Sequence, residues 1–111
     1  MPNFDDFIDQ LKNDLVDHAQ QFGDDVMDEF VEDGKAFAEE AKGDLKRWTQ
    51  LMAEGKLTSD DLKFLVKGKK DLAKMEALKQ KGLAKARLDK FKDILVGTVV
   101  SLAITLFEGH S

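Results

Sequence analysis

The single proline of this chain, at position 2, leaves residues 3–111 without the residue that most effectively breaks a helix. The 111 residues are 42% hydrophobic and 35% charged, which is too apolar for disorder and suits solvated helices. Cysteine is absent, which excludes disulfides and thiolate chemistry. A chain of this length normally forms one domain. The sequence therefore predicts one all-α domain over residues 1–111.

Local capping signals divide the chain in two. Asn3 can cap a first helix, and Thr58 with Asp61 has capping-box spacing at the start of a second. Gly55 suits the left-handed position that follows a helix. We therefore expect a turn at residues 55–57.

The apolar residues on both sides of this turn repeat every 11 residues. Eleven residues in three turns give a nearly straight seam with a slight right-handed supercoil. We expect an antiparallel hairpin of two helices, about 3–54 and 58–108, each about 70–75 Å long at about 1.5 Å per residue. Its seam comprises Phe4, Ile8, Leu11, Leu15, Ala19, Phe22, Val26, Phe37, Trp48, Leu62, Ala73, Ala84, Leu88, Phe91, Leu95, Val99, Leu102 and Leu106.

Folding the repeat about Gly55 predicts a register in which large residues meet small ones. Phe4 faces Leu106 at the open end, and Ala19 faces Phe91 further in. Such volume complementarity is what a close-packed interior requires.

Polar residues enter the seam near the turn. Asp33 faces Ala77, and Asp44 comes within reach of Lys69. One interpretation is a splayed or wetted stretch that helps to fix the register. The other is a polar pocket or ion path.

Glycines inside the expected helices each cost about 1 kcal/mol relative to alanine. Gly23 and Gly34, which are 11 residues apart, either permit close approach of another helix or mark a kink. The pattern leaves open whether these two, Gly68, Gly82 and Gly97 kink the helices.

Charge is segregated along the chain. Residues 1–33 hold eleven acids and one base, whereas residues 63–92 hold eleven bases and three acids. Opposite charges favour the hairpin, yet the acids from Asp5 to Asp17 would lie beside its uncharged end. A second, inverted copy would bring a basic helix to this acidic surface.

Apolar residues outside the seam also predict self-association, because a lone hairpin would leave them exposed. A homodimeric four-helix bundle is the simplest closed arrangement, and higher oligomers remain open. The expected interface comprises Leu65, Leu72, Leu83, Ile94, Val96, Val100, Ile104 and Phe107.

The alternative is a peripheral membrane protein. A basic helix over residues 63–92 could lie on anionic headgroups while residues 94–107 insert into lipid. Those 14 residues are shorter than the roughly 20 needed to span a bilayer.

The sequence predicts no catalytic, cofactor or metal site. His18 and His110 are the only histidines, and the Glu-x-x-His motif of di-iron bundles is missing. Phosphate loops and nucleophile elbows are also missing. The lysines of residues 63–92 surround the helix beside an acidic partner, which makes nucleic-acid binding an unfavoured hypothesis. We therefore expect a non-enzymatic interaction module, and we expect it in the cytoplasm because the N-terminus lacks a secretory signal.

Overall fold

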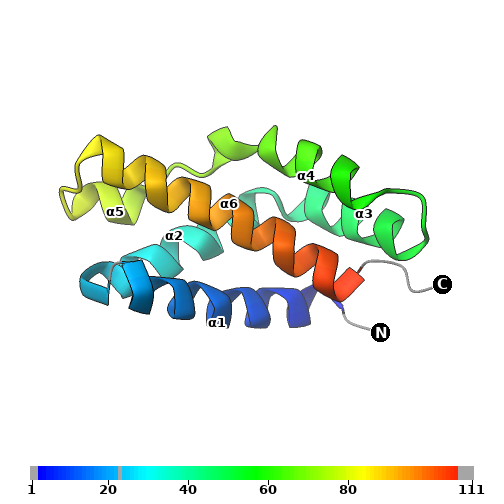
Figure 1. The fold of residues 1–111 in the computed structure, drawn as a ribbon, viewed down its shortest axis with the longest axis horizontal. Coiled ribbons are helices and arrows are strands. Elements are labelled where there is room, and N and C mark those ends of the chain that lie inside the picture. The colour runs from blue at the N-terminus through cyan, green and yellow to red at the C-terminus, as the bar shows by residue number, and fades with distance from the viewer. Residues whose placement is uncertain (1–2, 23, 108–111) are drawn as a thin grey trace.

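The computed structural model of the protein describes residues 3–22 and 24–107, apart from the side chain of Phe22. Six α-helices and two short 3-10 turns, at Asp24–Val26 and Lys70–Leu72, account for nearly all of this part, and it contains no strand (Figure 1). The prediction of an all-α chain is confirmed. The helices are α1 (Phe4–Phe22), α2 (Met27–Glu40), α3 (Lys42–Ala53), α4 (Ser59–Lys67), α5 (Glu76–Gln80) and α6 (Lys85–Phe107).

The prediction of two uninterrupted helices is wrong. The first expected helix is divided into α1, α2 and α3, and the second into α4, α5 and α6. The described residues form a compact body of 45 × 23 × 20 Å, far shorter than the expected rods. Two such rods would leave a second apolar face of each helix in water, whereas folding back buries these faces within one chain.

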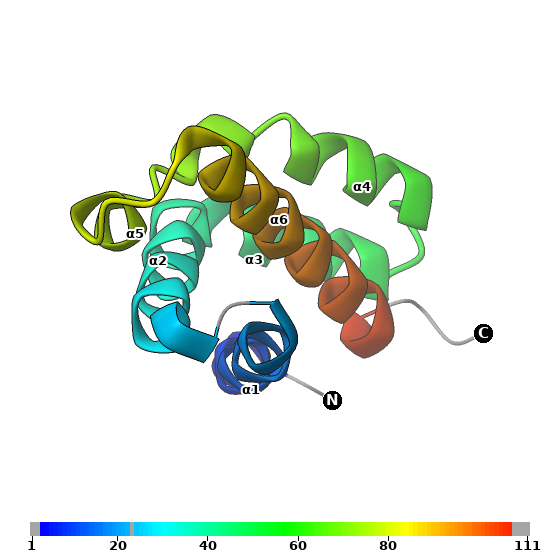
Figure 2. The ribbon, with the colours of Figure 1, turned by 60° about the vertical axis from the view of Figure 1, so that its left-hand side comes forward.

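The longest helix, α6, lies at the centre of the arrangement. It runs antiparallel to α1 and also contacts α3 and α4, so that α1 and α4 flank it on two sides (Figures 1 and 2). Helix α2 packs against both α1 and α5. Helices of the two halves therefore contact each other in the pairs α1 with α6, α2 with α5 and α3 with α4, but the structure does not confirm the specific 11-residue hairpin.

The turn between the halves lies where the capping signals predict it. Gly55 has φ of +76°, and the N–H of Lys56 donates to the carbonyl oxygen of Leu51 at 2.8 Å, as in a Schellman motif. Thr58 caps α4 by accepting the N–H of Asp61 at 3.1 Å, and the Asp61 carboxylate completes the capping box. This prediction is confirmed.

Glycine rather than proline marks several helix ends. Gly68 follows α4, and Gly82, with φ of +80°, follows α5. Helix α6 continues through Gly97. Gly23 lies outside the described residues. A glycine lowers the cost of ending a helix, and tertiary packing decides which glycines become helix ends.

Gly34 permits a close approach of three helices. A Cβ atom on this buried residue of α2 would lie 2.2 Å from Cδ1 of Leu15 in α1 and 3.2 Å from Cδ1 of Leu95 in α6. Both leucines are fully buried. Of the two interpretations of Gly34, close approach is the one that the packing supports.

We expect Gly34→Ala to lower the free energy of unfolding by about 1–2 kcal/mol, because overpacking outweighs the gain in helix propensity. Gly43, in α3, is the matched control, since a Cβ there would meet nothing within 4 Å. Gly43→Ala should raise stability by up to about 1 kcal/mol. Urea unfolding of both variants checks this, and a stabilised Gly34→Ala protein would contradict the packing argument.

Asp33 joins α2 to α5. Its carboxylate, in a residue that is 5% exposed, accepts the backbone N–H of Ala77 at 2.8 Å and of Leu78 at 2.9 Å. The chain enters α5 through Met75, a buried residue with φ of +55°. The predicted pairing of Asp33 with Ala77 is confirmed, and its role is to dock α5 rather than to line an ion path.

Most seam residues enter the core, although the seam itself is bent. Phe4, Ile8, Leu88 and Leu106 are half-buried, and Ala84, in the segment between α5 and α6, is exposed. The side chain of Phe22 lies outside the description. The buried members are Leu11, Leu15, Ala19, Val26, Phe37, Trp48, Leu62, Ala73, Phe91, Leu95, Val99 and Leu102.

Candidate functional site

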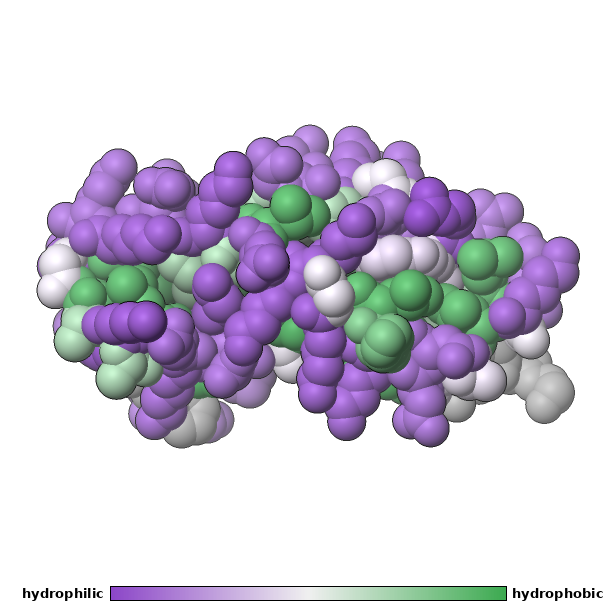
Figure 3. Space-filling model, turned by 90° about the horizontal axis from the view of Figure 1, so that it is seen from above, coloured by the Kyte–Doolittle hydropathy of each residue, from purple (hydrophilic) through white to green (hydrophobic). Residues whose placement is uncertain are grey.

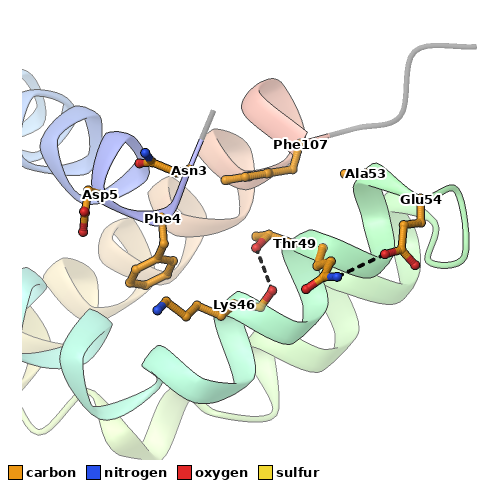
Figure 4. A pocket seen from close by; sticks show the side chains of 9 residues that line it. Asn3, Phe4, Asp5, Lys46, Thr49, Ala53, Glu54 and Phe107 are labelled. Carbon is orange, nitrogen blue, oxygen red and sulfur yellow. Dashed lines mark hydrogen bonds between the residues drawn. The ribbon is translucent and has the colours of Figure 1, made fainter. Parts of the chain in front are cut away.

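A pocket of about 700 Å³ opens at one end of the molecule, where the start of α1 and the end of α6 meet α3 (Figure 4). This volume falls within the range of roughly 300–1,000 Å³ that small-molecule sites occupy. The start of α1 is fixed by Asn3, whose Oδ1 accepts the N–H of Asp6 at 2.9 Å. We call this cavity the end pocket.

Aromatic rings form the apolar side of the end pocket. Phe7 is fully buried behind it, with its ring centroid 5.5 Å from that of Phe4 and 6.2 Å from that of Phe107. Phe4 and Phe107 themselves line the cavity, together with Ala53. The position of both lining rings is therefore set by packing against a third ring in the core.

Polar residues line the end pocket from the start of α1, with Asn3 and Asp5, and from α3 and its C-cap, with Lys46, Thr49, Gln50 and Glu54. Nζ of Lys46 lies 5.6 Å from the centroid of the Phe4 ring, a cation–π distance. Lys46 has no carboxylate partner among the described residues. In contrast, Glu54 accepts a hydrogen bond from Gln50 at 3.2 Å and lies 3.4 Å from Nζ of Lys56.

The hydroxyl of buried Thr49 is satisfied within its own helix, because Oγ1 donates to the carbonyl oxygen of Leu45 at 2.7 Å. The Thr49 hydroxyl can therefore accept a hydrogen bond from a ligand, but its own hydrogen is already donated. Among the described residues, no histidine lines the end pocket. The described lining residues can bind an apolar group and a charge, and none of them is a nucleophile activated by a neighbouring base.

A second hollow, of about 330 Å³, lies between α1 and α6. Asp14 and His18 line it from α1, and Gly97, Thr98 and Ser101 from α6. Within the described residues, no three histidine, aspartate or glutamate side chains are arranged to hold a metal ion. His110 lies outside the described residues.

The predicted interface residues are divided between the core and its edge. Leu65, Leu72, Leu83, Ile94 and Ile104 are half-buried against the core, and Figure 3 shows that apolar areas on the upper face are broken up by hydrophilic side chains. Val96, Val100 and Phe107 are buried within the single chain. For these three the expectation of an exposed face is wrong, because α1, α3 and α4 supply the cover that a second chain was expected to supply.

The burial of α6 also bears on the lipid alternative. Val99, Leu102 and Ala103 belong to the core together with the three residues above, so insertion of residues 94–107 into lipid would require α6 to leave it. None of the described helices combines the length and apolarity needed to cross a bilayer.

Ion pairs join the acidic and basic parts of the chain at the α5 end. Arg87 pairs with Asp25 at 2.8 Å, and Lys81 approaches Glu29 at 3.8 Å. The hydrogen bond from Arg87 holds the pKa of the Asp25 carboxyl below its ordinary value. Part of the charge segregation is therefore neutralised within one chain.

The same holds near α3 and α4. Asp44 lies 3.1 Å from Nζ of Lys69, as the sequence predicts, and it also accepts a hydrogen bond from Arg47. These cations lower the pKa of Asp44, with the hydrogen bond from Lys69 as the largest cause. By contrast, Asp5 and Asp9 of α1 have no cationic partner in the described part of the chain.

Sequence reasoning did not find the end pocket. Phe4 and Phe107 were expected to meet opposite helices or a second chain, and Lys46 carried no signal that distinguished it from other surface lysines. The pocket exists because α3 folds back beside the ends of α1 and α6, which no local pattern predicts.

No protein-family model, curated protein or solved structure matches this chain. A proposed function must therefore come from the geometry of its own residues.

Proposed function

We propose that this protein is a non-enzymatic interaction module that associates with a second copy of itself through the exposed side of α6. This surface, the α6 face, consists of Ile94, Gly97, Ser101, Ile104 and Thr105. The proposal places the module in the cytoplasm, a reducing compartment in which a chain without cysteine needs no disulfide.

The uncharged character of the α6 face carries the proposal. Residues 94–107 contain no charged side chain in a protein of which 35% is charged. Gly97, Ser101 and Thr105 are exposed one turn apart, and Ile94 and Ile104 are half-exposed beside them. Depletion of charge at the centre of a surface is the compositional signal of protein interfaces. The hollow between α1 and α6 borders this face and could receive a side chain of the partner.

Charge favours an inverted second copy. The first residues of α1 include Asp5 and Asp9, which have no cationic partner among the described residues, and they lie beside the end of α6 because the two helices are antiparallel (Figure 1). The start of α6 is basic, with Lys85 exposed there. Pairing two α6 faces in antiparallel orientation brings the basic start of one α6 near the acidic start of the other copy's α1, and such attraction weakens as salt screens it.

Gly97→Arg tests the proposal. A Cβ at Gly97 would meet nothing within 4 Å, so the monomer should tolerate the side chain, whereas the α6 face should not. Light scattering after size exclusion should give twice 12.5 kDa for the wild type and 12.5 kDa for Gly97→Arg.

The control is Gly43→Arg, which adds the same side chain at a second open position, away from the α6 face, and should remain dimeric. A wild-type protein that is monomeric at millimolar concentration would overturn the proposal. A dimer that persists in Gly97→Arg would show that another surface associates.

A further inference from the structure

We infer that the end pocket is a binding site for a small amphiphile that carries one carboxylate on an apolar chain. The site differs from the α6 face in position and chemistry, because it lies at the end of the molecule and contains aromatic rings and a cation.

The apolar half of the site is preformed. Phe107 is only 7% exposed, and its ring is held by the fully buried Phe7, which also stacks on Phe4. Ala53, from α3, lines the opposite side of the pocket, and its small side chain leaves space for a ligand there. An alkyl chain that enters here loses contact with water on several sides without requiring these rings to be reordered.

The charge that we expect on the ligand follows from the ion pairs of the residues that line the pocket. Glu54 is engaged by Gln50 and by Lys56. Asp5 lines the same pocket, and in the view of Figure 4 its carboxylate and the Lys46 ammonium lie on different sides of the Phe4 ring. Lys46 is therefore the cationic group of this pocket without a counter-ion in the described part of the chain.

A carboxylate is the group that completes this site. Its oxygens would accept charge-assisted hydrogen bonds from the Lys46 ammonium, while the attached chain lies against the rings. Lysine suits this role because its ammonium is a compact charge on a flexible stem that can turn from the Phe4 ring toward a ligand. A cationic amphiphile would instead bring like charge to Lys46.

The test is an NMR titration of the full-length protein with decanoate, decanol and decylammonium, which share a ten-carbon chain, below their micelle concentrations. Decanoate should give saturable amide shifts around Phe4, Thr49 and Phe107, and it should bind at least about tenfold more tightly than decanol. Decylammonium should bind most weakly. Shifts that do not saturate, or tighter binding of decylammonium, would overturn the inference.

Variants locate the head group. Lys46→Met keeps the apolar stem and should weaken decanoate binding by about tenfold without affecting decanol, whereas Lys46→Arg should retain it. Lys42→Met removes an exposed charge one turn earlier in α3, and it should change the affinity for neither decanoate nor decanol. Unchanged decanoate affinity in Lys46→Met would overturn the assignment of the head group. Binding should survive in Gly97→Arg, which separates this site from self-association.

Discussion

Phe91→Ala should lower the free energy of unfolding by about 3–5 kcal/mol, the range for removing a buried aromatic ring. Phe91 is 2% exposed, and its ring centroid lies 4.8 Å from that of the fully buried Phe30, with the planes tilted by 53°. The pair joins α6 to α2, and the Arg87 guanidinium lies 5.6 Å from the Phe91 ring. Removal of one ring leaves a cavity in the core and exposes its partner.

Phe64→Ala is the matched control, because Phe64 is 75% exposed on α4. The same change there should alter stability by less than about 0.5 kcal/mol. Urea unfolding followed by circular dichroism measures both. Equal unfolding midpoints for wild type and Phe91→Ala would mean that this ring pair does not hold the two helices together.

Asp33→Ala should lower the free energy of unfolding by about 2–4 kcal/mol. The backbone N–H groups of Ala77 and Leu78 lose their acceptor, and the hydrogen bond to Leu78 is buried. Asp33→Asn should cost less, since its amide oxygen can still accept one of the two hydrogen bonds. Hydrogen exchange should accelerate selectively at Ala77 and Leu78. Glu32→Gln, which removes the exposed neighbouring carboxylate, should leave the protection of both amides unchanged.

The Asp33 carboxyl should also make the free energy of unfolding depend on pH. Burial raises its pKa more than the hydrogen bonds from Leu78 and Ala77 lower it, and Glu32 and Glu76 raise it further. The folded chain therefore holds this proton more tightly than the unfolded chain, in which the pKa is about 3.9. The stability from protonation is complete below that value and is lost as pH rises through the raised pKa. The penalty of Asp33→Asn should accordingly shrink with rising pH, and a penalty that grows would contradict this sign.

The features that the sequence predicts correctly are short-range or depend on pairing across the turn. Gly55 and Thr58 act through neighbours within four residues, so their roles follow from local geometry. The pairing of Asp33 with Ala77 and of Asp44 with Lys69 follows from the antiparallel return of the chain about that turn. Both pairs form although each half of the chain is divided into three helices.

The candidate site, in contrast, depends on contacts between residues far apart in the sequence. The end pocket combines residues from α1, α3 and the last turn of α6, and α3 reaches this place only after the chain has folded back. An 11-residue period records which side of a helix is apolar, but not which other helix covers it. Phe7 illustrates this, since it lies off the predicted seam and is fully buried.

By itself, the sequence determined the all-α class, the turn at Gly55 and most of the residues that avoid water. Only the tertiary structure decided where each half breaks and that one chain covers most of its second apolar face. The reason is a difference in magnitude. A glycine changes the cost of continuing a helix by about 1 kcal/mol, whereas each apolar side chain that folding back buries contributes about 1.5–3 kcal/mol. Local preferences of this size permit a long hairpin. The burial of several apolar side chains outweighs these preferences and favours the folded-back arrangement.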